Sequence, residues 1–275
     1  MKNKYLLSLV TVYMCYFTHG MQALILSQNK TNFFQQWGYT DVKAGAAAVS
    51  MAITAIGFGK FLSVWIGGEF SDRVGRKKMA VIGGLLYILC FAGLLFTTDF
   101  KIACICAFIS GVATSGFWDA ALYPAVQEAV PDYSASALIG IKLFVSISGM
   151  IYPLLVVNFA NGGNWHMNIW IPLIFSIVCT VLAMIAPFAY DDMMKEKGSS
   201  ADNKKGNAVQ AEIEAAKARQ LVKPNGLVNF ITIFYAFLCM FIMYGAQQYT
   251  KAFGMNNAGL TEMQAAALTS VYTLG

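Results

Sequence analysis

Charged residues are scarce in this chain of 275 residues, which carries a formal net charge of +5. Only 12% of the residues are Asp, Glu, Lys or Arg, whereas a soluble domain contains about 25%. Hydrophobic residues make up 57% of the chain. A soluble protein of this composition would expose large apolar patches and would aggregate. The composition therefore excludes an ordinary soluble domain and indicates an integral membrane protein.

Several kinds of chemical site are also missing from the sequence. All six cysteines lie inside apolar runs, so they suggest neither a disulfide framework nor a metal site. The sequence contains no nucleotide-binding P-loop and no recognisable hydrolase or metalloprotease constellation. The basic residues are spread over loops, so nucleic acid is not an expected partner. We expect a protein that is not an enzyme, with no catalytic residues, no metal and no cofactor.

What the sequence does have is long apolar runs. A helix needs about 20 apolar residues to cross a bilayer, and seven stretches are long enough. They are Tyr5–Leu26, Ala44–Phe70, Met79–Thr98, Ile102–Tyr123, Ala135–Phe159, Ile169–Tyr190 and Leu227–Tyr249. The first is too long for the apolar region of an ordinary signal peptide and no small-residue cleavage site follows it, so we interpret it as a span. An eighth apolar stretch begins near Met263 and is too short to cross.

Lys and Arg are distributed unequally over the two sides of these spans. With the N-terminus in the cytoplasm, the cytoplasmic segments hold two before the first span, four in 71–78 and seven in 190–226, which is 13 in all. The opposite side holds four. Because cytoplasmic loops of membrane proteins are enriched in basic residues, we expect a multi-pass protein of the bacterial inner membrane or the plasma membrane, with a cytoplasmic N-terminus.

The order of the spans predicts three parts. Residues 1–190 form a six-helix transmembrane bundle, residues 191–226 form a cytoplasmic linker, and residues 227–275 begin a second, incomplete bundle. Within the linker, the apolar residues of Ala208–Val222 recur at helical spacing. This spacing indicates a short amphipathic helix on the membrane surface, although a solvated tether is almost equally compatible with the composition.

A short basic loop lies between the second and third spans, and it reads Gly-Glu-Phe-Ser-Asp-Arg-Val-Gly-Arg-Lys-Lys from Gly68 to Lys78. Its spacing resembles the G-x-x-x-D-R-x-G-R-K loop of the major facilitator superfamily. The resemblance implies an all-α membrane fold of twelve helices in two six-helix halves, truncated here to the first half and the start of the second. It also implies alternating access, in which the halves rock around a site at the membrane midplane.

In that family the loop helps to hold and release a gate. The resemblance therefore implies gating roles, joined in a charge relay, for Gly68, Asp72, Arg73, Gly75, Arg76, Lys77 and, near the inner end of the fourth span, Asp119. The glycines would allow tight turns or close helix approach. Asp72 would cap the next helix or accept from an arginine, and the arginines suit bidentate pairing with carboxylates. The alternative is that the basic residues only anchor the topology.

Lys60 is the most informative single residue, because it lies inside the second span. A charge at that depth costs about 2.5–3.5 kcal/mol on insertion scales and usually faces a cavity, a partner or a solute. The string Ile56-Gly57-Phe58-Gly59-Lys60-Phe61 is similar to the organophosphate:phosphate antiporter branch of the superfamily. That branch grips phosphate with arginines inside spans, and here none of the three arginines lies in a span. Snorkelling or pairing of Lys60 with a carboxylate is the alternative.

Other polar residues inside the spans complete the expected solute site. Tyr16, His19 and Gln22 are three apart and form a stripe on the first span. His19 either takes part in proton coupling, since imidazole titrates near neutral pH, or is a hydrogen-bonded core histidine. Lys142 in the fifth span either lines the cavity, pairs with Asp119 or snorkels. Gln247 near the outer end of the seventh span either bonds solute hydroxyls or meets lipid headgroups.

From these features we expect a secondary active transporter, a monomer in the lipid bilayer. It would move a small, polar, anionic organic solute by alternating access, together with a proton or in exchange for a counter-solute. Two alternatives stay open. One is a transporter of a neutral sugar or a drug, and the other is a transporter-like sensor that transports nothing.

Overall fold

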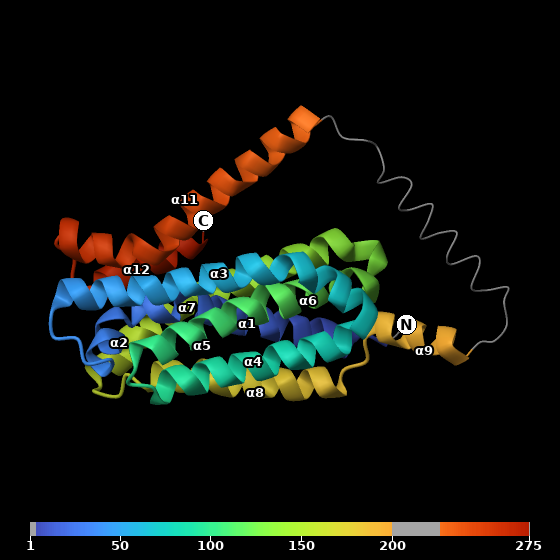
Figure 1. Cartoon of the computed structure of the whole chain (residues 1–275), viewed down its shortest axis with the longest axis horizontal. Helices are drawn as coiled ribbons and strands as arrows, with labels where there is room; N and C mark the ends of the chain where they lie inside the picture. Colours follow the sequence, from blue (N-terminus) through green and yellow to red (C-terminus); the bar gives the residue numbers. More distant parts are fainter. Residues whose placement is uncertain (1–3, 200–225, 275) are drawn as a thin grey trace.

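The described part of the computed structural model, residues 4–199 and 226–274, is built of helices and the turns between them (Figure 1). The first helices are α1 (Leu6–Gln28), the short α2 (Lys30–Gln36), α3 (Val42–Val74) and α4 (Arg76–Phe96). The fourth span consists of α5 (Phe100–Val112), the π-helical turn η1 (Ala113–Asp119) and α6 (Ala120–Ala129). The 3₁₀ turn η2 (Pro131–Tyr133), α7 (Ser134–Asn161), α8 (Met167–Ile185), α9 (Ala189–Ser199), α11 (Gly226–Asn257) and α12 (Glu262–Leu274) follow.

Seven helical segments of the described residues are long and apolar enough to cross a membrane. They correspond to the seven predicted spans, and the all-α membrane fold is therefore confirmed. The helices run past several predicted ends. The fourth, for example, continues from Tyr123 to Ala129 before Pro131. This extension brings Glu128 to the Gly68–Lys78 loop, where it pairs with Arg76. The predicted amphipathic helix over Ala208–Val222 lies outside the described residues.

Helix boundaries follow from local sequence signals. Asp41 and Asp99 cap the first turns of α3 and α5, where their carboxylates accept from the backbone N–H groups of Ala44 and Lys101 at 2.7 Å each. Capping aspartates satisfy donors that a helix start leaves free. Between α3 and α4 the chain turns at Gly75, whose φ of 99° lies in a region that side chains with a Cβ avoid.

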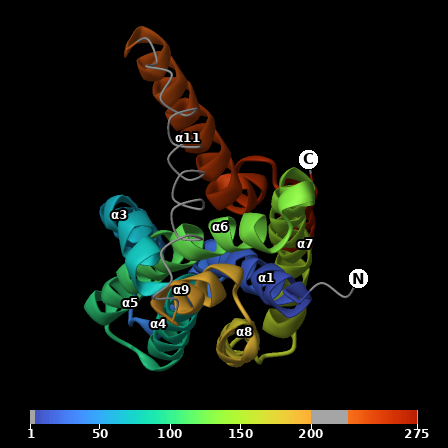
Figure 2. The same cartoon turned by 90° about the vertical axis from the view of Figure 1, so that its right-hand side faces the viewer.

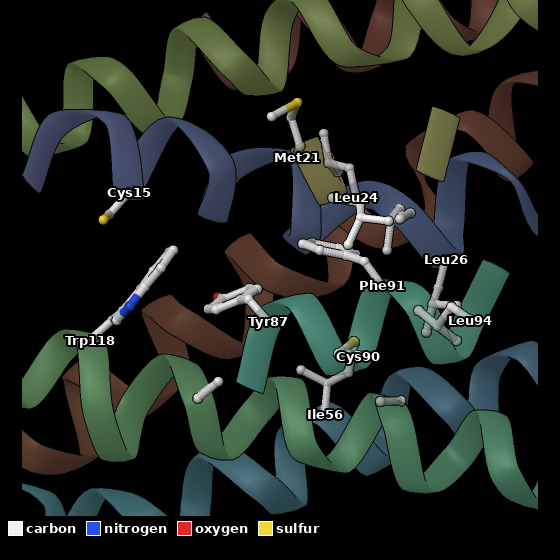
Figure 3. Packing of buried hydrophobic residues seen from close by; sticks show 14 of the residues in the cluster. Cys15, Met21, Leu24, Leu26, Ile56, Tyr87, Cys90, Phe91, Leu94 and Trp118 are labelled. Atoms are coloured by element: carbon white, nitrogen blue, oxygen red, sulfur yellow. The ribbon is translucent and has the colours of Figure 1, made fainter. Parts of the chain in front are cut away.

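The core of the six-helix bundle lies between α1, α4 and the fourth span. Figure 3 shows Met21, Leu24 and Phe91 grouped together, with Trp118 on the other side of Tyr87. The Tyr87 ring centre is 5.7 Å from that of Phe91 and 4.3 Å from that of Trp118. The Trp118 indole N–H donates to the Ala80 carbonyl oxygen at 3.1 Å, so its polar end is satisfied. Many apolar side chains are instead exposed on the outside of the bundle, among them Trp65, Ile66 and Phe96. Such an exterior suits a helix bundle surrounded by lipid.

The six-helix bundle has two ends, a loop end and a far end. The loop end carries the Gly68–Lys78 loop and the start of α1, and the far end carries the end of α1 and the start of α3. Helix α11 approaches the bundle at the far end and diverges from it towards the loop end (Figures 1 and 2). Helix α12 turns back from α11 and lies against α7.

Candidate functional site

A polar cluster lies inside the bundle around Asp119, the last residue of the π-helical turn η1. The Tyr16 hydroxyl of α1 donates to Asp119 Oδ1 at 2.9 Å. The Ser115 hydroxyl, one turn earlier, donates to Oδ2 at 3.1 Å. π-Helical turns inside α-helices occur frequently at functional sites. Here the turn brings Ser115 and Asp119 together and directs the carboxylate towards α1.

Two lysines face this carboxylate from different helices. Lys60 of α3 is half-buried and Lys142 of α7 is exposed, and both interact electrostatically with Asp119. Neither lysine forms an ion pair with another described residue. The Lys142 ammonium instead lies 5.5 Å from the centre of the Tyr123 ring, which in turn is 5.2 Å from the Tyr16 ring. Two cations and one carboxylate therefore lie near one another. The part of the bundle that carries Lys60, Asp119 and Lys142 is called the inner surface.

The other residues of the predicted stripe on α1 hold neighbouring helices. His19 Nδ1 and the Tyr87 hydroxyl are 2.9 Å apart, and the Tyr87 and Thr114 hydroxyls are 2.6 Å apart. The Gln22 amide donates to the Ser110 hydroxyl at 3.0 Å, and Gln22 is 1% exposed. Of the predicted stripe, Tyr16 thus contacts the charged cluster, His19 is half-buried next to it, and Gln22 is enclosed by protein.

At the loop the structure places Glu128, and not Asp119, next to Arg76, and the relay to Asp119 stays a prediction. Arg76 is 7% exposed, and it pairs with Asp72 at 2.7 Å and with Glu128 at 3.1 Å. Glu128 lies nine residues after Asp119, which is about 13 Å along a helix. The sequence interpretation ended the fourth span at Tyr123. Because the helix continues to Ala129, Glu128 reaches the loop and Asp119 stays inside the bundle.

The loop is also held by the start of α9. The Asp191 carboxylate accepts from the Lys77 backbone N–H at 3.0 Å, so Asp191, and not Asp72, caps the start of α4. The Tyr190 hydroxyl donates to the Asp72 carbonyl oxygen at 2.7 Å, and its ring lies 4.4 Å from the Arg76 guanidinium carbon. A Cβ at Gly75 would come within 2.5 Å of an Asp191 oxygen. Loop and α9 thus form one assembly.

The remaining loop residues lie at the surface. Arg73 pairs with Glu69 on the same helix, and both side chains are more than 70% exposed. Gly68 has open space around its Cα, so its predicted role in close helix approach is not used here. The Asp192 carboxylate pairs with Lys4 at 2.8 Å and raises the pKa of that lysine. This pair links the start of the chain to the same assembly.

A family model described as "Major Facilitator Superfamily" matches residues 6–275. The chain belongs to the major facilitator superfamily. The inner membrane transport protein YdiM of Escherichia coli (strain K12) is 28% identical over 275 residues, which is 100% of this chain and 63% of YdiM. The multidrug resistance protein MdtM of the same strain is 29% identical over 147 residues, covering 51% of this chain and 32% of MdtM.

Membership of the superfamily agrees with the fold. A crystal structure of a D-xylose-proton symporter matches with a TM-score of 0.72 and 15% sequence identity, covering 98% of this chain and 66% of the symporter chain. At this identity the match concerns the fold alone. The chain spans less than two thirds of the length of YdiM. The similarity to the organophosphate:phosphate antiporter branch stays a prediction from one short string.

Three residues that the sequence interpretation missed have recognisable signals in retrospect. Glu128 is a carboxylate just before Pro131, at the same membrane end as the basic loop. Asp191 opens the polar segment after the sixth span. Gln248, the neighbour of the predicted Gln247, is 5% exposed and donates to the Ala23 carbonyl oxygen at 2.7 Å. For adjacent glutamines on one helix, the sequence does not tell which one faces the bundle.

Proposed function

We propose that this protein is a secondary active transporter that moves a small, polar, anionic organic solute by alternating access. The observation that carries this proposal is the pair of lysines, Lys60 and Lys142, on one inner surface without an ion-pair partner among the described residues. An intramembrane charge is costly unless it is paired or faces a cavity. An anionic solute supplies the missing partner.

The other residues of the cluster have supporting roles in this proposal. Tyr16 and Tyr123 offer hydroxyl groups and aromatic rings beside the lysines. Asp119 takes up a proton when the anion binds. The bound anion compensates the positive charges of Lys60 and Lys142, so these charges no longer stabilise the ionised Asp119 carboxylate. The proton is then carried with the solute, and its gradient across the membrane drives transport. Exchange against the gradient of a counter-solute is the other form of coupling. Gln247 and His19 contribute hydrogen bonds from the edges of the site.

We further propose that the loop end faces the cytoplasm of a bacterial inner membrane or a plasma membrane, with the protein as a monomer. The excess of Lys and Arg at this end supports the orientation. The printed description of YdiM as an inner membrane transport protein supports the location.

Transport by the purified protein, reconstituted in liposomes, tests the proposal. We expect exchange of at least one labelled carboxylate, sulfonate or sugar acid above the rate of empty liposomes. Lys60→Ala should lower this exchange about tenfold or more, because one charge-assisted contact to a carboxylate is lost. Lys43→Ala, which removes an exposed lysine of the far end, should leave it unchanged. Full exchange by the Lys60 variant would contradict an anionic solute.

A drug is the second candidate solute, favoured by the partial similarity to MdtM, which is described as a multidrug resistance protein. A groove of about 550 Å³ between α3 and α11 supports it, because its lining is rich in aromatic side chains, among them Phe58, Phe61, Phe241, Tyr244 and Tyr249. Aromatic surfaces suit apolar and cationic ligands. Transport of a cationic dye that survives Lys60→Ala but fails in Phe61→Ala would favour this candidate.

A further inference from the structure

Helix α11 contacts the six-helix bundle at one end. Its first part is exposed, with Phe230, Phe237 and Met240 each about 60% accessible or more. Near its far end the exposure falls to 5% at Gln248 and 7% at Lys251. Figures 1 and 2 show the same divergence of α11 from the bundle towards the loop end. The far end of this helix is therefore the part that is fastened.

Lys251 makes the strongest of the contacts that fasten it. Its ammonium donates to the Gln28 carbonyl oxygen of α1 at 2.9 Å and to Glu262 of α12 at 2.8 Å. The last carbonyl groups of a helix have no partner within the helix and carry partial negative charge. A buried lysine that satisfies one of them and also pairs with a carboxylate joins three helices at a single point.

A second contact lies beside it on the same two helices. Gln248 donates to the Ala23 carbonyl oxygen at 2.7 Å. Gln248 precedes Lys251 by about one helical turn on α11, and Ala23 precedes Gln28 by about one and a half turns on α1. The two contacts therefore occur in the same order along both helices. The Lys30 ammonium, 5.9 Å from the Tyr249 ring centre, adds a weaker one. Polar groups of α11 and of the α1–α2 region thus connect the two helices at the far end.

We infer that Lys251 is a gating residue that keeps the far-end entrance to the inner surface closed in this state. Its bonds to Gln28 and Glu262 fasten α11 to α1 and α12 at the far end, while the loop end of α11 stands apart from the bundle (Figure 1). Loss of these bonds releases α11 at the far end. The inference uses the proposed function in one respect only, namely that the inner surface is a solute path with two entrances.

Spin-label distances across the far-end entrance test this inference. The labels are attached to cysteines introduced by Thr40→Cys and Asn257→Cys, because both positions are exposed. Cys104 and Cys239, the cysteines that are not buried, are replaced by serine. Pulsed dipolar spectroscopy without solute then compares Lys251→Met with the otherwise unchanged protein. We expect Lys251→Met to raise the population at longer distance about tenfold, as loss of a charge-assisted hydrogen bond implies.

Matched variants separate gating from nonspecific loosening. Lys101→Met removes an exposed lysine of the same end and should leave the distances unchanged, and Lys251→Arg should restore the short distance. If Lys251→Met does not insert, Glu262→Gln is measured in its place and should give a smaller shift in the same direction. Unchanged distances in the measured variant overturn the inference. Because no solute is present, the result is independent of whether the protein transports an anion.

Discussion

Arg76 and Lys60 are both basic side chains in an apolar protein, but their surroundings differ. Arg76 is enclosed by Asp72, Glu128 and the Tyr190 ring. Lys60 interacts with Asp119 across a longer distance and forms no ion pair with a described residue. A fully paired cation stabilises a structure, whereas an unpaired one is available to a ligand. This difference separates the mechanical role of Arg76 from the binding role proposed for Lys60.

Replacing Glu128 should therefore weaken the loop. Glu128→Gln removes one carboxylate from Arg76 and should lower the free energy of unfolding by about 1.5–3 kcal/mol, the usual range for a hydrogen bond to a charged group. Thermal unfolding in detergent measures the effect. Asp132→Asn, at an exposed carboxylate of the same end, is the control. Equal melting temperatures for the two variants would mean that Glu128 contributes little to holding Arg76.

Residue-scale prediction from the sequence was only partly successful. The structure contains the ion pair of Asp72 with Arg76, two residues that the loop motif had singled out. Side chains four residues apart lie next to one another on a helix. In this structure Glu128, and not Asp119, is the second carboxylate at Arg76. The sequence did not indicate Glu128, since hydropathy locates the apolar part of a helix but not its last polar turns. The charged cluster around Asp119 was only partly foreseen, because contacts between α1, α3, α7 and η1 depend on how the helices pack.

At the scale of elements, the crossing of α3 and α5 positions Lys60. A Cβ at Gly111 would lie 2.1 Å from the Ile56 carbonyl oxygen, and one at Gly59 would lie 2.2 Å from the Phe108 carbonyl oxygen. The two backbones therefore approach one another at glycines, as is common where membrane helices cross closely. The apolar runs predicted both helices, but not which glycines form the crossing.

Filling this crossing should move the helices apart. Gly111→Ala is expected to destabilise the protein by about 1–3 kcal/mol, the usual cost of overpacking, because a rigid backbone and not a mobile side chain stands in the way. Gly57→Ala is the control. Gly57 lies on α3, and nothing stands within 4 Å of a Cβ added there, so this substitution should cost little. Melting temperatures of the purified variants measure both. A stable Gly111 variant would mean that α3 and α5 can separate freely.

At the scale of the molecule, the architecture was predictable from hydropathy because lipid leaves few alternatives to helices that satisfy their own backbone groups. The family was predictable from the spacing of one loop. The placement of α11 was not predictable, since it depends on a few polar contacts at the far end. Those contacts involve Lys251, which the sequence interpretation only counted as an outer loop residue.

The orientation of the whole molecule gives a direct test. Asp132 lies at the loop end and Thr98 at the far end, and both are exposed. A single cysteine is introduced at each position, by Asp132→Cys in one variant and Thr98→Cys in another. In intact cells, a membrane-impermeant maleimide should label the cysteine at 98 and leave the one at 132 unlabelled until the membrane is opened. Labelling of the unmodified protein provides the background from its own cysteines. The reverse pattern would contradict a cytoplasmic loop end.

The π-helical turn η1 fixes the rotational register of the fourth span. Gly111, before the turn, packs against the backbone of α3, and Glu128, after the turn, forms an ion pair with Arg76. A π-turn contains one residue more than an α-turn, so removing a single residue from 113–119 would let the span become regular without shortening it by a full turn. The parts before and after the deletion would keep nearly the same rotation relative to one another, because six α-helical residues turn about as far as seven residues of a π-helix. A regular α-helix with all the residues of this span would instead rotate Asp119 and Glu128 by about 100° relative to Gly111. The π-helical turn is therefore what lets Gly111, Asp119 and Glu128 all meet their partners at this count of residues.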